Sequence, residues 1–232
     1  MCCQFLVKKG SIYFCLNILI VEDHYPVIEA YKMFFSLSKF GDNLNFIEAI
    51  SCEDTYLKIQ QALSENIVFD IAIIDYSLPT FPEQNLLNGA DIILYLQKVM
   101  PNCKTMMLTA IMENLTLFEI TQNIRPDAIA TKSDIDGTNF LNIIETIASG
   151  KKFRSDYVIE RVEEIWQNKA FVNEQNRKIL HFLSQGYLLK EIAIELAVSE
   201  ITIKKRVAKI KLLLGINDNE NILREAKKRG FI

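Results

Sequence analysis

Residues 16–150 alternate between short continuous apolar runs and longer segments with an apolar stripe along one side. The runs predict strands covered on both faces, and they lie at 17–21, 44–50, 69–74, 104–109 and 127–131. The one-sided segments predict amphipathic helices, and they lie at 25–39, 53–66, 88–99, 112–123 and 138–149. Five strand–helix units predict a doubly wound α/β domain, a five-stranded parallel sheet that binds ligands at the carboxyl ends of its strands.

From residue 173 onward the pattern becomes wholly helical. A short helix over 190–196 leads to a tight turn and to Ser199, a good N-cap for the next helix. In that helix apolar residues recur at 4-3-4 spacing, as the buried face of a helix does, and they are Ile203, Val207, Ile210 and Leu214. Its basic residues fall outside this stripe. Two helices joined by a short turn, the second strongly basic, predict a helix-turn-helix.

These patterns divide the chain into four segments. Residues 1–15 precede the first convincing strand and form an N-terminal extension, and residues 16–150 form the α/β domain. Residues 151–172 form a linker in which 157–168 can make an amphipathic helix, and residues 173–232 form the small all-α domain.

The net charge of −3 hides a strong asymmetry. Residues 1–150 hold 9 Lys and Arg against 18 Asp and Glu, which gives −9. Residues 171–232 hold 12 against 7, which gives +5, and the 20 residues between them hold 5 against 4. An acidic part joined to a basic one suggests that the basic end meets a polyanion, although an ordinary charged surface would look the same.

Composition excludes several classes. The five cysteines show neither metal-ligand spacing nor a disulfide framework, and two histidines make a zinc site improbable. No apolar stretch approaches the roughly 18 residues of a membrane span, and residues 1–15 lack the features of a signal peptide. We therefore expect a protein of the reducing cytoplasm that does not enter a membrane.

Polar side chains stand at the ends of four predicted strands. Glu22 and Asp23 end the first, Asp75 the third, Thr109 the fourth and Lys132 the fifth. Carboxylates at neighbouring strand ends can hold a divalent cation, and a carboxylate is a competent nucleophile toward phosphorus. Each residue alone has an ordinary structural explanation, such as a helix cap for Asp75, but the ordered set is specific.

Here the chain resembles a known family. Residues 17–149 resemble the flavodoxin-like receiver domain of bacterial two-component response regulators, through Ile-Leu-Ile-Val-Glu22-Asp23, Ile-Ile-Asp75-Tyr-Ser-Leu-Pro79, Leu-Thr109-Ala110 and Thr-Lys132-Ser133. Residues 173–232 resemble the LuxR-type helix-turn-helix, through Gly186, Lys190-Glu191-Ile192-Ala193 and Ser199-Glu200-Ile201-Thr202-Ile203-Lys204. Their order is that of the NarL/FixJ-type regulators of transcription.

The resemblance implies a phosphorylation switch. Asp75 would accept a phosphoryl group from a sensor histidine kinase. Glu22, Asp23, Asp75 and the backbone carbonyl of Ser77 would hold Mg²⁺ or Mn²⁺. Thr109 and Lys132 would contact the phosphoryl oxygens. No enzymatic turnover is expected beyond self-phosphorylation from small phosphodonors and slow autodephosphorylation.

The second motif implies that the protein binds double-stranded DNA. The predicted contacts are Lys204, Lys205 and Lys209, together with Arg206 and Thr202. Paired half-sites favour a homodimer in the phosphorylated state, and RNA polymerase is a further candidate partner.

The sequence also departs from the family pattern. Ile129 stands where an aromatic residue usually switches position, and the loop from Leu78 to Gly89 is longer than usual. Asn176 and Arg206 replace a usual acid and a usual histidine. A regulator that works without phosphate, using a degenerate receiver to dimerise, therefore stays open as an alternative. A phosphatase of the haloacid-dehalogenase type is disfavoured, because that family carries a second Asp at the position of Ser77.

Overall fold

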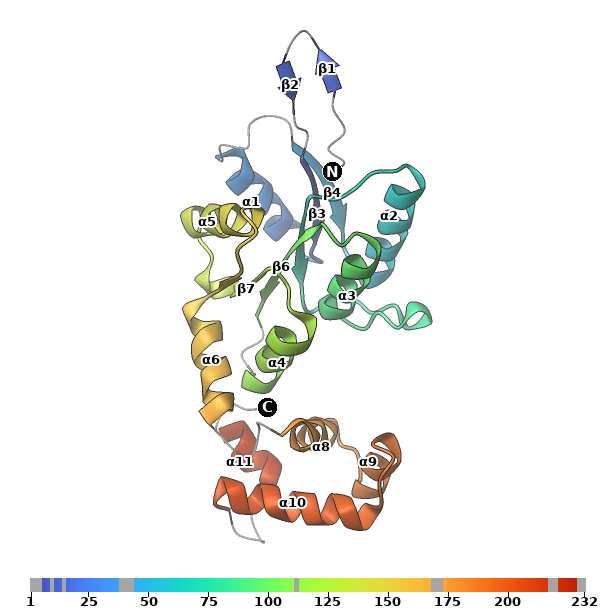
Figure 1. Cartoon of the computed structure of the whole chain (residues 1–232), viewed down its shortest axis with the longest axis vertical. Helices are drawn as coiled ribbons and strands as arrows, with labels where there is room; N and C mark the ends of the chain where they lie inside the picture. Colours follow the sequence, from blue (N-terminus) through green and yellow to red (C-terminus); the bar gives the residue numbers. More distant parts are fainter. Residues whose placement is uncertain are drawn as a thin grey trace. The chain divides into compact units, whose positions relative to one another are not determined.

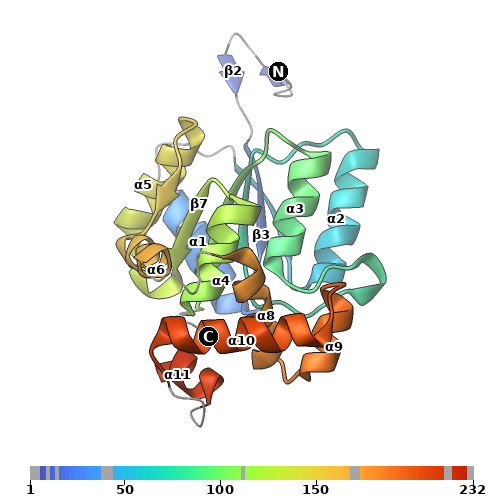
Figure 2. The ribbon, with the colours of Figure 1, turned by 60° about the horizontal axis from the view of Figure 1, so that its bottom comes forward.

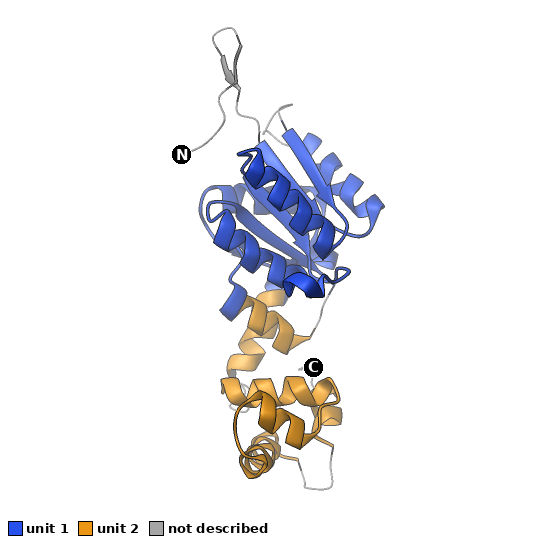
Figure 3. Cartoon of the chain, turned by 90° about the vertical axis from the view of Figure 1, so that its right-hand side faces the viewer, with its two compact units in different colours: residues 1–110, 123–157 blue, residues 111–122, 158–232 orange. Residues whose placement is uncertain are grey.

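The computed structural model describes residues 6–8, 11–13, 16–37, 44–110, 113–167, 173–216 and 221–228. Their contacts form two compact units, shown in Figure 3. The first unit comprises 1–110 and 123–157, and the second comprises 111–122 and 158–232. The predicted domain boundaries at 150 and 173 were drawn from sequence pattern alone and stay a prediction.

A parallel sheet with strand order β4-β3-β5-β6-β7-β8 forms the centre of the first unit (Figure 1). This order and the helices between the strands confirm the predicted doubly wound α/β fold. The strands are β3 (Leu16–Val21), β4 (Leu44–Ala49), β5 (Ile71–Asp75), β6 (Lys104–Thr109), β7 (Ala128–Thr131) and β8 (Phe153–Arg154). Separately, β1 (Leu6–Lys8) and β2 (Ser11–Tyr13) form an antiparallel pair in the predicted N-terminal extension.

Helices cover both faces of the sheet because its strands are apolar on both sides. Helices α1 (Tyr25–Ser36) and α5 (Gly137–Ala148) cover one face, and α2 (Cys52–Ser64) and α3 (Gly89–Val99) cover the other (Figure 2). The core beneath α1 and α5 is built from Phe35 and Phe140, whose rings meet edge to face at 5.3 Å, and from alternate strand residues such as Ile18 and Ile20.

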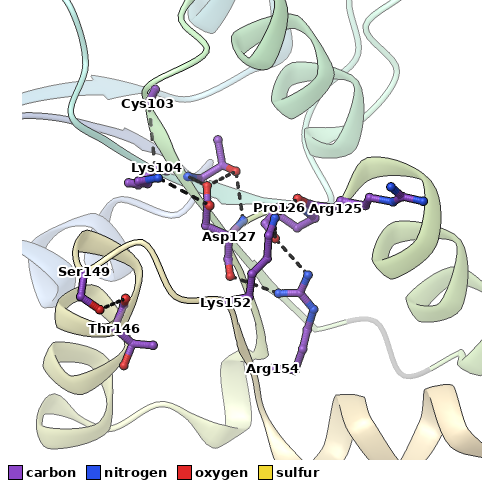
Figure 4. A network of polar contacts seen from close by, with 10 residues as sticks. Cys103, Lys104, Arg125, Pro126, Asp127, Thr146, Ser149, Lys152 and Arg154 are labelled. Carbon is purple, nitrogen blue, oxygen red and sulfur yellow. Dashed lines mark hydrogen bonds and ion pairs between the residues drawn. The ribbon is translucent and has the colours of Figure 1, made fainter. Parts of the chain in front are cut away.

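The sixth strand, β8, was not predicted from the sequence. It pairs in parallel with β7 at the sheet edge, and polar contacts hold it there (Figure 4). The Arg154 guanidinium donates to the carbonyls of Asp127 at 3.2 Å and Pro126 at 3.0 Å, and Lys152 donates to the carbonyl of Arg125 at 2.9 Å. Two residues are too few to give a periodic signal, so only these tertiary contacts reveal the strand.

The second unit is helical. Its helices are α4 (Asn114–Glu119), most of α6 (Asp156–Gln167), α8 (Glu174–Ser184), α9 (Leu189–Glu195), α10 (Glu200–Leu214) and α11 (Ile222–Lys228). The predicted helix over 112–123 is shorter than expected, because α4 gives way to a π-helical turn at Ile120–Ile124. The described residues contain no helix long and apolar enough to cross a lipid bilayer.

The helix-turn-helix prediction is confirmed by α9 and α10. The turn between them passes through Ala197, which has a φ of +51°, and the Ser199 hydroxyl caps α10 by accepting a hydrogen bond from the Thr202 amide. Of the four residues predicted for the buried face, Ile203, Ile210 and Leu214 are buried and Val207 is partly buried.

Candidate functional site

Asp75 is the last residue of β5, one of the central strands, and is 5% exposed. On one side its backbone pairs with Leu108 of β6, which places Thr109 one residue further along the neighbouring strand. Thr109 in turn pairs with Thr131 of β7, and Lys132 follows directly. Strand register alone therefore brings three of the predicted residues to one edge of the sheet.

The acidic pair follows β3 on the other side of β5. Glu22 is 1% exposed and its amide donates to the Ala49 carbonyl at 2.9 Å, which fixes the chain as it leaves the sheet. Asp23 is more open, and the exposed imidazole of His24 lies 2.7 Å from its carboxylate and 3.2 Å from that of Glu22. The hydrogen bond to Glu22 and the charge of Asp23 raise the pKa of His24.

Lys132 joins the two buried carboxylates. Its Nζ lies 2.7 Å from Glu22 Oε2 and 3.2 Å from Asp75 Oδ1. Burial lowers the pKa of Lys132, but the hydrogen bond to Glu22 and the charge of Asp75 outweigh burial and raise it overall. Burial also raises the pKa of Asp75, helped by the charge of Glu22 and opposed by Lys132. Burial therefore disfavours the charged form of Asp75, and the ammonium group of Lys132 opposes this effect.

The donor set suits a hard divalent cation. Carboxylate oxygens of Glu22 and Asp23 lie within 4.8 Å of one another and of a His24 ring nitrogen, and Asp75 reaches Glu22 through their shared contact with Lys132. Oxygen ligands of this kind are those that Mg²⁺ prefers. Ser77 lies on the exposed stretch just after Asp75, which is where a further carbonyl ligand was predicted.

The sequence did not indicate a role for Gly89, whose backbone lies directly against that of Asp75. A Cβ atom on this residue would lie 1.9 Å from the carbonyl oxygen of Asp75 and 2.9 Å from the Ile74 side chain. The Gly89 amide also donates to the Tyr76 carbonyl at 2.9 Å. Only glycine permits so close an approach of α3 to the end of β5. The only signal in the sequence was a Gly after Asn88, a residue that caps α3.

The long segment between Asp75 and Gly89 has its own structure. Phe81 and Leu86 exchange backbone hydrogen bonds, at 2.6 and 3.1 Å, around a short 3₁₀ turn (Pro82–Gln84), and Asn85 takes a φ of +56°. The Phe81 ring packs 5.8 Å from that of Tyr56 on α2. The predicted long loop is therefore a small anchored hairpin.

The predicted DNA contacts lie on α10, away from its buried stripe. Lys204, Lys205 and Lys209 are exposed, while Thr202 and Arg206 are partly buried. Lys204 pairs with Glu200 at 2.7 Å, an exposed contact of little energetic weight. The same helix exposes two apolar side chains to which the sequence pattern assigned no role, Ile201 at 66% and Leu212 at 78%.

A cavity of about 270 Å³ separates the flank of α10 from the start of α8. Its lining residues are Asn173, Asn176, Arg206, Lys209 and Leu213. Asn176 and Arg206 are two of the positions at which the chain departs from the family pattern, and both line this cavity. The replacement of an acid by Asn176 leaves this cavity with two cationic side chains and no carboxylate among its lining residues.

Solved structures with the same architecture are response regulators. A structure of two RcsB dimers bound to two parallel DNAs has a TM-score of 0.61 and 20% sequence identity, covering 91% of this chain and 98% of that chain. RcsB from Salmonella enterica serovar Typhimurium, bound to promoter P1flhDC in the presence of the phosphomimetic BeF₃⁻, has a TM-score of 0.60 and 20% identity over 91% and 97% of the two chains. The chain has the RcsB fold.

Sequence comparison gives a distant relative and no family model that matches. The transcriptional regulatory protein MctR of Rhizobium johnstonii (strain DSM 114642 / LMG 32736 / 3841) is 22% identical over 219 residues, which cover 94% of this chain and 95% of that protein. The fold that the sequence motifs implied is thus confirmed over nearly the whole chain.

We predict that Gly89→Ala destabilises the first unit by about 1–3 kcal/mol, because its Cβ would overlap the Asp75 carbonyl and force backbone shifts. Urea unfolding measures the loss. Gly137→Ala is the matched control, since a Cβ there meets only the edge of the Phe34 ring at 3.1 Å. Equal stability of the two variants would contradict the close approach at Asp75.

We predict that Asp75→Asn raises the free energy of unfolding at pH 7 in the presence of EDTA. The pKa of Asp75 is higher in the folded chain than its usual 3.8, so ionisation of this carboxyl costs stability above the folded pKa and costs nothing below the unfolded one. Lys132 keeps Glu22 as its partner in the variant.

The gain should therefore be present at pH 7 and vanish near pH 3.5. Thermal unfolding of both chains across this range measures it. A gain that stays constant with pH, or a loss at pH 7, would show that burial does not disfavour the Asp75 carboxylate.

Proposed function

We propose that this chain is a DNA-binding response regulator of transcription whose activity is controlled by phosphorylation of Asp75. The observation that carries the proposal is the joint contact of Lys132 with Asp75 and Glu22 at adjacent strand ends. RcsB, which shares the fold, has been solved with DNA and with a phosphomimetic. A sensor histidine kinase is the phosphodonor in this proposal.

In this proposal, Asp75 is the nucleophile of the phosphoryl-transfer step. A carboxylate oxygen of Asp75 attacks the phosphorus of a phosphohistidine, the phosphorus–nitrogen bond breaks, and the histidine nitrogen leaves with the electron pair and takes a proton. Lys132, whose Nζ lies 3.2 Å from Asp75 Oδ1, would pair with a phosphoryl oxygen. The Thr109 hydroxyl, one strand away, supplies a neutral donor for a second oxygen.

Glu22, Asp23, Asp75 and the Ser77 carbonyl would hold the divalent cation. When bound, Mg²⁺ offsets the negative charge that gathers between the phosphoryl group and the carboxylates. Two contacts of the chain itself hold the site. The Glu22 amide donates to the Ala49 carbonyl, and the backbone of Gly89 packs against the carbonyl of Asp75. Both contacts position the nucleophile before any phosphodonor arrives.

In this proposal the DNA-binding surface lies on helix α10. Its exposed lysines, Lys204, Lys205 and Lys209, suit a helix that enters the major groove, and Arg206 and Thr202 flank them. The cationic cavity beside α8 would lie along the phosphate backbone. Phosphorylation would favour a homodimer, because paired half-sites demand a twofold arrangement, and RcsB binds DNA as dimers.

One observation favours the alternative, a regulator that works without phosphate. Ile129 is fully buried at the position where the family has a mobile aromatic residue, so an aromatic switch is absent at this position. The two functions differ in whether Asp75 is modified, and the next experiment separates them.

We predict that acetyl phosphate with Mg²⁺ adds one phosphoryl group to the full chain, and that Asp75→Asn abolishes the added mass. Intact-mass spectrometry at neutral pH measures the added mass. Glu22 is the other carboxylate that contacts Lys132, so the Asp75→Asn variant tests whether Asp75 is the one modified. Glu83→Gln, in the hairpin beyond Asp75, is the control and should be modified like the natural chain. Modification of the Asp75→Asn variant would contradict the proposal, and no modification of either chain would favour the alternative.

We predict that Lys205→Met and Lys209→Met each weaken binding to a mixed-sequence duplex. Each lost phosphate contact should make the slope of log affinity against log salt shallower by about 0.9. Fluorescence anisotropy across a salt series measures the slope. Lys178→Met, an exposed lysine on α8 that pairs with Glu174, is the control. Slopes equal to that of the natural chain would remove α10 from the DNA interface.

A further inference from the structure

Arg206 of helix α10 differs from the other buried arginines of the chain. Among the described residues, Arg154, Arg161 and Arg177 are buried or partly buried, and each guanidinium meets a carbonyl or carboxylate oxygen. Arg206 is also partly buried, yet no hydrogen bond or ion pair joins its side chain to any residue that the structure describes. A partly buried guanidinium without an acceptor is unfavourable, so this position favours an anion from outside the chain.

Arg206 lines the cavity of about 270 Å³ between α10 and the start of α8, two helices that pack together within the second unit (Figure 1). Lys209, three residues further along α10, lines the same cavity, and its ammonium group has no ion-pair partner in the described part of the chain. Glu174, at the start of α8, is paired with Lys178 at 2.7 Å and is not among the lining residues. Two cations therefore line one cavity, and none of its described lining residues is negatively charged.

The α8 side of the cavity is polar but uncharged. It is formed by Asn173 and Asn176, and Asn176 is only 4% exposed. The Asn173 Oδ1 atom accepts a hydrogen bond from the Asn176 amide at 3.2 Å, which leaves the Asn173 Nδ2 group as a hydrogen-bond donor. The α8 side can therefore donate to an anion and does not repel one.

Leu213 gives the cavity an apolar wall. Arg206, Lys209 and Leu213 follow one another at spacings of three and four residues, which places them on one face of α10 over roughly 10 Å of helix. A molecule that contacts the whole face carries an anionic head and a short apolar body. The cavity is slightly smaller than the roughly 300–1,000 Å³ pockets of drug-sized ligands, so this molecule is small.

We propose that this cavity binds a small organic oxyanion, a phosphate or a carboxylate with a short apolar body, and that the bound anion competes with DNA. The guanidinium of Arg206 presents a planar fork of donors to two oxygens of the head, and Lys209 adds a compact charge. Both residues are predicted DNA contacts, so a molecule that occupies them excludes a phosphate of the DNA backbone. The competition rests on the proposed function, whereas anion binding itself does not.

Phenylphosphonate is a suitable probe. Its head resembles phosphate, its ring is apolar, and its phosphorus–carbon bond prevents phosphoryl transfer to Asp75. Nuclear magnetic resonance of the full ¹⁵N-labelled chain in EDTA measures binding and locates it. We expect saturable shifts at Asn173, Asn176 and Leu213 with a Kd in the millimolar range or below, weaker binding of inorganic phosphate, and no saturation by the uncharged benzyl alcohol.

Variants test whether the cations of the cavity are responsible. Arg206→Gln and Lys209→Gln should each weaken phenylphosphonate binding about tenfold, the loss expected for a hydrogen bond to a charged group. Lys209 is exposed, so its variant covers the outcome in which Arg206→Gln does not fold. Lys190→Gln, which replaces an exposed lysine of α9 outside the cavity, is the matched control and should bind as the natural chain does.

Three results of this titration would overturn the site as proposed. The first is a titration of the natural chain that does not saturate. The second is an equal loss of affinity in Lys190→Gln, which would mean that the anion meets only a diffuse positive surface. The third is inorganic phosphate that binds as tightly as phenylphosphonate, which would remove the apolar body from the proposal.

Fluorescence anisotropy with a mixed-sequence duplex, at constant ionic strength, measures the competition. At about ten times its own Kd, phenylphosphonate should weaken DNA binding about tenfold relative to chloride. If the chain binds phenylphosphonate but not DNA, the anion site stands and the proposed function fails. If it binds both and neither displaces the other, the competition is overturned. If Arg206→Gln weakens DNA binding but the natural chain binds no free anion, the cavity serves the DNA backbone alone and the proposal is overturned.

Discussion

The contact of one ammonium group with two buried carboxylates is the interaction on which the account of this protein depends. Glu22 and Asp75 are almost completely buried, and two such charges at neighbouring strand ends would repel each other without a cation between them. Lys132 supplies that cation at 2.7 and 3.2 Å. Under the proposed function, a phosphoryl group and a divalent ion would enter this site and change the balance of charge around Lys132.

The fold brings Glu22, Asp75 and Lys132 together at one edge of the sheet. Parallel strands place the residues that follow them at a common edge, so positions far apart in the sequence become neighbours through register alone. The apolar core on both faces gives that edge its rigidity. Gly89 adds a local constraint, since the absence of its side chain lets α3 begin directly behind Asp75. The close approach of Gly89 to the Asp75 backbone therefore affects both the stability of the first unit and the position of Asp75.

The sequence predicts much of this arrangement and omits some of it for identifiable reasons. The strand-end carboxylates, Thr109 and Lys132 could be placed because strand order and apolar periodicity are local signals. The cap at Ser199 and the basic helix after it could be placed for the same reason. Strand β8, the contact of Gly89 with Asp75 and the union of α4 with α8 depend on residues that meet only in the folded chain. No periodicity in one segment encodes such meetings.

The most direct test of the central contact is the ionisation of Lys132 in the folded chain. Nuclear magnetic resonance of protein labelled with ¹³C at lysine Cε follows it, and Lys132→Arg assigns the signal. If Lys132 joins the two carboxylates, it keeps its proton to a higher pH than an ordinary lysine, whose pKa is about 10.4. A pKa at or below this ordinary value would mean that Lys132 does not join the two carboxylates, and would contradict the arrangement described here.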